Sequence, residues 1–213
     1  MSFRARAVVL KRMRVGDGDI LARLYGTGGM MDVLVRDGFR VSCAFSGLFE
    51  PFNLLELELS QMGSVLLPED VLGVERLSFY CRDYRRYRWM CWVSLFALRH
   101  MRFYDEKLLS LLVGALRTDP KRREGVLRVR FKLEFLILSG FKPKFLGEEV
   151  GRGTLKVRLS DGGVGEDGEV EVEGSVLRAL VRLHSGEGRV RYSGRALAKM
   201  DELLEKLIEY HTK

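Results

Sequence analysis

The sequence predicts an α+β protein in which a small β-barrel comes first and a mainly helical domain follows. Two observations predict this order. Residues 4–74 alternate apolar and polar side chains in short segments that end at glycine-rich turns, which is typical of β-strands. Beyond residue 78 the apolar side chains recur at three- and four-residue steps, which is typical of helices. We therefore place a barrel domain at 1–77 and a helical domain at 78–213.

The barrel segment contains five predicted strands. Leu55, Leu57 and Leu59 show the pattern clearly, because a polar residue follows each of them. Five strands in about seventy residues fit a closed sheet of the OB type, in which one side chain of each alternating pair is buried. An SH3-like barrel and an open meander are the alternatives. The strands are expected at 4–15, 20–25, 30–36, 52–61 and 65–67.

Three helices are predicted after the barrel. The first spans 79–103, and Asp83 lies near its start, where a carboxylate complements the helix dipole. The second spans 104–116. The third, 121–138, also alternates as a strand would, but it is longer than most strands, so we favour a helix. Pro120 is expected at the first position of this third helix.

The C-terminal part follows Gly140, which is a ready cap for the third helix. Residues 154–173 alternate on either side of a glycine-rich loop, and this pattern predicts a β-hairpin insertion in the helical domain. Ser175 and Ser193 are expected to cap two final helices, the second of which ends near Tyr210.

The net charge of +7 favours polyanionic partners, of which nucleic acid is the first candidate. Asn53 and Gln61 are the only side-chain amides, and the scarcity of these thermolabile residues resembles a thermophile's protein. Cys43, Cys81 and Cys91 form no CxxC pair, so we expect reduced thiols and neither a disulfide framework nor a zinc knuckle.

The sequence carries no catalytic signature, so we expect no enzyme activity and no cofactor. The segment 26–29 is rich in glycine but lies between two predicted strands, which favours a hairpin turn over a phosphate cradle. The N-terminus lacks the apolar core of a signal peptide, and no apolar run reaches about 18 residues. A cytoplasmic location without membrane contact is therefore expected.

Three groups of basic residues are candidates for binding a polyanion. Arginines on strands beside loops suit a groove that follows a phosphate backbone, with Tyr25, Phe39 or Phe45 available to stack on bases. The barrel group is Lys11, Arg12, Arg14, Arg23, Arg36 and Arg40. The helical groups are Arg82, Arg85, Arg86 and Arg88, and Lys121, Arg122, Arg123, Arg128, Arg130 and Lys132. A solvated outer face is the alternative for the barrel group. The tryptophans beside the first helical group, Trp89 and Trp92, are more often core anchors between domains than stacking platforms, and a run such as the second helical group is usually a solvated helix face.

Four short motifs follow one another along the chain. They are a strand with a glycine–aspartate turn at 7–19, the strand Leu-Phe-Glu-Pro-Phe-Asn-Leu-Leu-Glu-Leu at 48–57, the helix end Leu-Ser-Gly-Phe-Lys-Pro at 138–143, and a closing helix at 207–211. Their order resembles the RecO family of bacterial recombination mediators and DNA-repair proteins. The resemblance covers nearly the whole chain.

The resemblance implies a non-catalytic protein with an N-terminal OB domain and a C-terminal helical domain. RecO-like proteins bind single- and double-stranded DNA, anneal complementary strands and help to load the recombinase onto strands coated by single-stranded-DNA-binding protein (SSB). The implied partners are RecR, often RecF, and the acidic, phenylalanine-ended C-terminal tail of SSB. Many members carry a four-cysteine zinc site after the helix end, but residues 145–174 contain no cysteine, so no zinc is expected here.

The resemblance also suggests site residues. Arg36 and Arg40 follow the third strand, where the family often has basic residues, and Lys11 and Arg23 are added from the charge of the barrel. The tail of SSB needs an apolar slot with cations at its rim. The candidates for that rim are Arg82, Arg85, Arg86, Arg88, Arg128, Arg130 and Lys132. An RNA-binding or ribosome-associated OB barrel and a protein–protein adaptor are the alternative functions.

Overall fold

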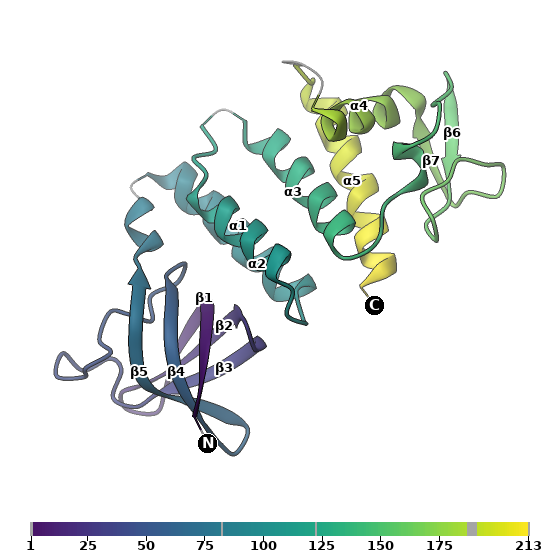
Figure 1. The fold of residues 1–213 in the computed structure, drawn as a ribbon. Helices are drawn as coiled ribbons and strands as arrows, with labels where there is room; N and C mark the ends of the chain where they lie inside the picture. Colours follow the sequence, from purple (N-terminus) through teal and green to yellow (C-terminus); the bar gives the residue numbers. More distant parts are fainter. Residues whose placement is uncertain (1, 82, 122, 187–190, 213) are drawn as a thin grey trace. The chain divides into compact units, whose positions relative to one another are not determined.

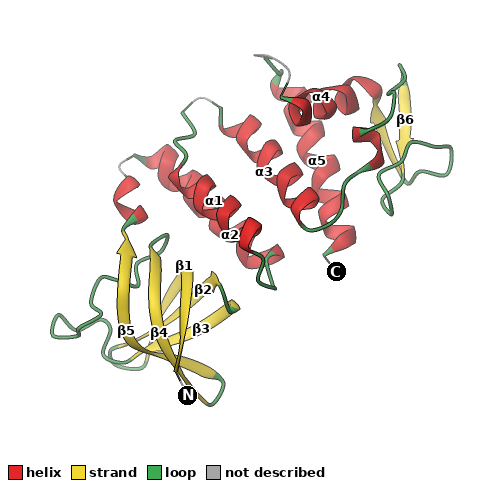
Figure 2. Cartoon of the chain, viewed as in Figure 1, coloured by secondary structure: helices red, strands yellow, loops and turns green. Residues whose placement is uncertain are grey.

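The computed structural model describes residues 2–81, 83–121, 123–186 and 191–212 (Figure 1). It has the predicted α+β composition of a strand barrel, helices and a small hairpin (Figure 2). Contacts between residues divide the chain into two compact units, 1–121 and 122–213. The predicted boundary after residue 77 marks the change from strands to helices, and the next two helices belong to the barrel unit.

The first unit contains all five strands of the barrel and two α-helices. Its elements are β1 (Ser2–Val15), β2 (Asp19–Gly26), β3 (Gly29–Val35), β4 (Leu54–Met62), β5 (Val65–Glu75), the 3₁₀ helix η1 (Leu77–Tyr80), α1 (Tyr84–His100) and α2 (Glu106–Arg117). The strands close in the order β1-β2-β3-β5-β4, with β4 pairing back to β1. Only β3 and β5 run parallel among these neighbours. This closed five-stranded order confirms the predicted OB-type barrel.

The barrel core comes from the inward positions of each strand. Val9, Val33 and Leu57 are among the fully buried aliphatic side chains that fill it. The prediction that β5 ends at residue 67 is wrong, because the strand passes Pro68 and continues to Glu75. The register of β4 against β5 shifts twice near this point, and such bulges accommodate a residue that has no N–H to donate.

The connection from β3 to β4, residues 36–53, packs against the barrel as a series of tight turns. Its Phe49 is buried in the barrel core. Asn53 holds the end of the connection, and its side chain is fully buried. The Asn53 amide donates to the carbonyl of Leu48 at 3.0 Å, and its carbonyl oxygen accepts from the N–H of Ser78 at 3.2 Å. Asn53 thus joins the connection to η1.

The two helices of the first unit begin at aspartates. Asp83 accepts a backbone N–H of the first turn of α1, and Asp105 does the same for α2, so the predicted carboxylate near the start of α1 is confirmed. Trp89 of α1 is buried, and its indole N–H donates to the carbonyl of Ala115 at 2.8 Å. This tryptophan therefore fixes α1 against α2.

The second unit is a helical core with a hairpin beside it. Its elements are α3 (Glu124–Leu138), the 3₁₀ helix η2 (Lys144–Leu146), β6 (Thr154–Val157), β7 (Val170–Glu173), α4 (Gly174–Ser185) and α5 (Gly194–His211). The antiparallel pair of β6 and β7 confirms the predicted hairpin. Among the helices that the structure describes in either unit, none is long and apolar enough to cross a membrane.

The third predicted helix, α3, is a helix and not a strand. Gly140 follows its end with a φ of +90°, a conformation that favours glycine. The N–H of Phe141 donates to the carbonyl of Leu136 at 3.0 Å, which completes the hydrogen-bond pattern of a Schellman cap. The glycine cap predicted from the sequence is therefore confirmed.

Two of the predicted helix starts are wrong. Pro120 does not open α3, because Lys121 adopts a φ of +42° and takes the chain out of helical geometry. Ser175 does not cap α4, because Glu173 occupies the N-cap position and the helix already begins at Gly174. Ser193 caps α5 as predicted, since its hydroxyl oxygen accepts a backbone N–H of the first turn.

Candidate nucleic-acid interface

The outer face of the barrel carries a cationic row across β1, β2 and β3. Lys11 lies directly opposite Arg23, which in turn lies opposite Asp32. Asp32 accepts two hydrogen bonds from the Arg23 guanidinium, at 2.8 and 2.6 Å, and this contact raises the pKa of Arg23. Two cations placed opposite each other repel, and a single carboxylate offsets them only in part. The row therefore attracts anions.

An apolar row runs beside the cationic row on the same face. Met13 lies opposite Leu21, and Leu21 lies opposite Leu34. Met13 is 44% exposed, and the two leucines are half-buried. Exposed carbon next to positive charge is the combination that single-stranded nucleic acid requires, since bases need an apolar contact and phosphates need cations.

Arg36 extends this face at the end of β3. Its guanidinium lies 3.4 Å from the sulfur of Met62, beside the turn between β4 and β5. Within the described part of the chain, neither Arg36 nor Lys11 forms an ion pair with a carboxylate. These two side chains are therefore available to phosphate groups.

Arg40, the fourth predicted DNA-binding residue, lies away from the two rows. Its guanidinium forms an ion pair with Asp37 at 3.0 Å, and both side chains are more than half exposed. The neighbouring Phe39 donates its N–H to the carbonyl of Gly18 at 3.0 Å, which places this segment over the turn between β1 and β2. The structure thus separates Arg40 from Lys11 and Arg23 and gives it a carboxylate partner.

A second cation–aromatic cluster lies on the opposite face of β1. Phe39 is 44% exposed, and the guanidinium carbons of Arg12 and Arg14 lie 5.4 and 5.9 Å from its ring centroid. Arg12 and Arg14 alternate along the strand with Lys11, so they face away from the cationic row. Of the three predicted stacking aromatics, Phe39 is the most exposed, since Tyr25 is buried and Phe45 is half-buried.

The other two predicted stacking residues are held by the fold. Tyr25 is fully buried, and its hydroxyl donates to the carbonyl of Phe103 at 3.0 Å. Phe45 is half-buried and packs edge-on against the buried Phe49, with 6.4 Å between the ring centroids. Tyr25 cannot stack on a base without opening the structure, whereas Phe45 keeps part of its ring accessible.

Two of the predicted partner-binding arginines of α1 donate to backbone carbonyls at or after the end of α2. Arg85 donates to the carbonyl of Lys121 at 3.1 Å, and Arg86 donates to the carbonyl of Arg117 at 2.9 Å. Cations stabilise the carbonyl end of a helix, so the Arg86 contact stabilises α2, which ends at Arg117. Arg85 instead holds the segment that follows α2. Arg88 is exposed. Arg82 and Arg122 lie outside the described residues.

The predicted partner-binding residues of α3 are also ion-paired. Arg128 pairs with Glu124 at 2.6 Å, and Arg130 pairs with Glu134 at 2.7 Å. Lys132 is only 4% exposed. Its ammonium contacts two carboxylates of α5, Asp201 and Glu205.

The assignment of Lys132 to a partner surface is therefore corrected. A buried ammonium between two carboxylates holds α3 to α5, and it is not accessible to a peptide. In the sequence, Lys132 belongs to a basic run that is typical of a solvated helix face. The run gives no sign that Lys132 is buried, because the two acids that neutralise it lie far along the chain, on α5.

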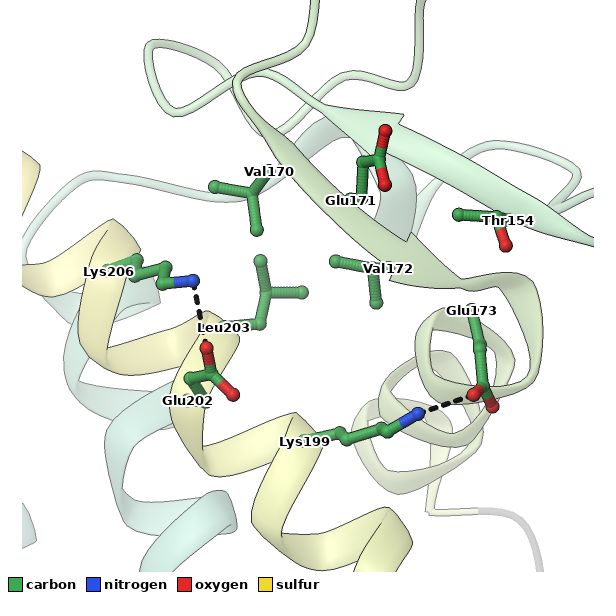
Figure 3. Close-up of a pocket in the computed structure, with 9 residues that line it drawn as sticks. All are labelled: Thr154, Val170, Glu171, Val172, Glu173, Lys199, Glu202, Leu203 and Lys206. Carbon is green, nitrogen blue, oxygen red and sulfur yellow. Dashed lines mark hydrogen bonds and ion pairs between the residues drawn. The ribbon is translucent and has the colours of Figure 1, made fainter.

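A groove of about 280 Å³ lies between β7 and α5 (Figure 3). Val170, Val172 and Leu203 form its apolar floor. Lys206 pairs with Glu202 at 2.9 Å, and Lys199 pairs with Glu173, so that each lysine lowers the pKa of its partner. Glu171 adds a third carboxylate to the lining. Because three carboxylates face two lysines, this groove does not suit an acidic peptide.

Comparison with known proteins finds a relative of this chain, although no family model matches it. An uncharacterized protein of Aquifex aeolicus (strain VF5) is 35% identical over 206 residues, which are 96% of each chain. The chain belongs to the family of this protein. The match spans both compact units.

Sequence reasoning missed the apolar row and the pairing of the cations. Met13 was available in the sequence as the residue between Arg12 and Arg14, and its alternation with Lys11 was the signal that it shares an outer face. The contact of Arg23 with Asp32 depends on the register between β2 and β3 and is not visible in local patterns. Among the residues that the structure describes, no cluster of three or more His, Cys, Asp or Glu side chains suits a metal ion.

Proposed function

We propose that the protein is a DNA-binding recombination mediator of the RecO type. In this role it binds single- and double-stranded DNA, anneals complementary strands and helps to load recombinase onto SSB-coated DNA. The observation that carries the proposal is the outer face of the OB-type barrel, where Lys11, Arg23 and Arg36 lie beside an apolar row. Phosphates suit the cations, and unpaired bases suit the exposed carbon.

The four ordered motifs of the sequence support the same proposal. Their resemblance to RecO spans both compact units, and the glycine of the helix-end motif occupies a position that only a glycine cap fills easily. RecR, often with RecF, and the acidic tail of SSB are the proposed protein partners. Arg85 and Arg88 of the α1 group are both exposed, and we retain them as candidates for contact with the tail.

Replacing Lys11 and Arg36 together by alanine is expected to weaken binding to single-stranded DNA and to reduce its salt dependence. On a single strand, each phosphate that the protein no longer binds lowers the slope of log K against log salt by about 0.7, so the double variant should show a slope smaller by about 1.4. Fluorescence anisotropy of a labelled oligonucleotide, titrated at several salt concentrations, measures both quantities.

The matched control is Lys206→Ala, which removes an exposed lysine of the second unit that pairs with Glu202. Its slope should equal that of the wild type. Arg40→Ala should change the slope less than either replacement in the cationic face, because Asp37 already neutralises that guanidinium. A double variant with the wild-type slope would place the DNA on a different surface.

An RNA-binding or ribosome-associated role is the second candidate, because an OB-type barrel with these two rows also suits unpaired RNA. Binding of DNA and RNA oligonucleotides of the same sequence separates the two. A mediator of the RecO type should bind the DNA at least as tightly, whereas a marked preference for RNA would favour the second candidate.

A further inference from the structure

A cavity of about 160 Å³ opens at one edge of the barrel's outer face. Its walls come from three segments: Leu34 and Arg36 at the end of β3, Leu67 and Pro68 of β5, and Ala44 and Phe45 of the 36–53 connection, which also contributes Cys43. The walls are mainly apolar, and among the described residues of the lining Arg36 alone carries a charge. Leu34 is also the last member of the apolar row, so the row leads directly into the cavity.

The size of the cavity suits one planar ring. An apolar cavity of about 150 Å³ in another protein binds benzene, so a single heteroaromatic base fits here and a base pair does not. Phe45 supplies an aromatic wall, and its edge-on contact with the buried Phe49 keeps that ring in place. A base entering beside Phe45 would therefore meet a fixed aromatic surface.

Tight turns hold the wall that faces β3. The N–H of Cys43 donates to the carbonyl of Arg40 at 3.1 Å, and the N–H of Ser46 donates to the carbonyl of Cys43 at 3.0 Å. The thiol of Cys43 lies 3.6 Å from the carbonyl of Arg36. These contacts fix Cys43, Ala44 and Phe45 against the end of β3, so the cavity is preformed.

Arg36 gives the cavity a partner for a phosphate. Its side chain is exposed, and the contact that the structure gives its guanidinium is the sulfur of Met62, a weak acceptor. An arginine that keeps most of its donors free binds a phosphate oxygen strongly.

We propose that this cavity receives one unpaired base of a DNA strand while Arg36 binds the adjoining phosphate. The inference rests on the proposed DNA-binding function and adds to it a preference for single-stranded over double-stranded DNA. A base within a duplex is stacked and paired, so it cannot enter without being flipped out, which costs a few kcal/mol. The cavity therefore makes the barrel favour single strands over duplex.

A cavity-filling variant tests the preference. Ala44→Leu adds bulk to an exposed position that lines the cavity, and Ser46→Leu adds bulk to an exposed position of the same connection that does not. Stacking of one base changes affinity by about 5- to 150-fold, so Ala44→Leu should lose that factor on single-stranded DNA and change duplex binding by less than about two-fold. Ser46→Leu should bind both as the wild type does. Equal affinities of Ala44→Leu and Ser46→Leu for single strands would overturn the cavity proposal.

Thiol footprinting of the wild-type protein gives a second, independent readout. Cys43 lines the cavity, whereas Cys81 and Cys91 lie outside it and serve as internal references. A saturating oligo(dT) should slow alkylation of Cys43 and leave the other two cysteines unchanged, and a duplex should protect none of the three. If oligo(dT) binds but Cys43 reacts at its free rate, the cavity proposal fails while the proposed function stands. If no DNA binds, both fail.

Discussion

Replacing Lys132 by alanine is expected to lower the free energy of unfolding by about 3 kcal/mol. The Lys132 side chain is 5% exposed, and its ammonium lies 2.8 Å from Asp201 and 2.5 Å from Glu205. Without it, two carboxylates four residues apart on α5 face each other without a counter-charge, and the lysine stem no longer packs between the helices. Urea unfolding followed by far-ultraviolet circular dichroism measures the change.

Two further variants separate the buried charge from surface charge in general. Arg130→Ala removes an exposed arginine of the same helix that pairs with Glu134, and it should cost less than about 1 kcal/mol. The triple variant Lys132→Met, Asp201→Leu and Glu205→Leu replaces all three charges by apolar groups and should recover most of the loss. A Lys132→Ala protein as stable as Arg130→Ala would show that the lysine does not hold α3 to α5.

Asn53→Ala is expected to destabilise the first unit by about 2 kcal/mol, because it leaves two partly buried backbone groups without partners, and a fully buried group would cost about 1–3 kcal/mol. These groups are the carbonyl of Leu48 and the N–H of Ser78, which both bond to the Asn53 side chain. Trp89 and Trp92 both belong to the first unit, so tryptophan fluorescence during urea unfolding follows the affected part.

The other side-chain amide of the chain provides the control for Asn53. Gln61 is exposed, and its amide donates to the carbonyl of Gly63 at 3.3 Å. Gln61→Ala should therefore change the free energy of unfolding by less than about 0.5 kcal/mol. Similar losses for the two amides would mean that the hydrogen bonds of Asn53 do not anchor the 36–53 connection.

Most of the fold follows from local patterns in the sequence. Alternation of apolar and polar residues located the strands, and Gly140 and Ser193 marked helix ends because their roles depend only on neighbouring backbone groups. The end of β5 was missed because Pro68 indicates a strand end, whereas the bulges that accommodate it arise only when β4 and β5 pair. Pro120 misled for a similar reason, since local propensity does not indicate the positive φ of Lys121.

The candidate site also contains residues that could be predicted from the sequence and residues that could not. Exposed cations such as Lys11 and Arg36 could be predicted from charge and alternation along one strand. The ion pairs of Arg23 and Arg40 could not, because each depends on which residue the fold brings opposite the guanidinium. Lys132 was the largest error. Its helix is buried on most sides, so the periodicity that separates a solvated face from a core face is weak there.

Annealing of complementary DNA strands coated with SSB is the most direct test of the proposed mediator function. We expect the wild-type protein to accelerate duplex formation, measured by quenching of a fluorophore pair at the strand ends. The Lys11→Ala and Arg36→Ala double variant should lose most of this acceleration, and Lys206→Ala, at an exposed lysine that pairs with Glu202, should keep it. Duplex formation at the same rate with and without the wild-type protein would contradict the proposal that this chain is a recombination mediator of the RecO type.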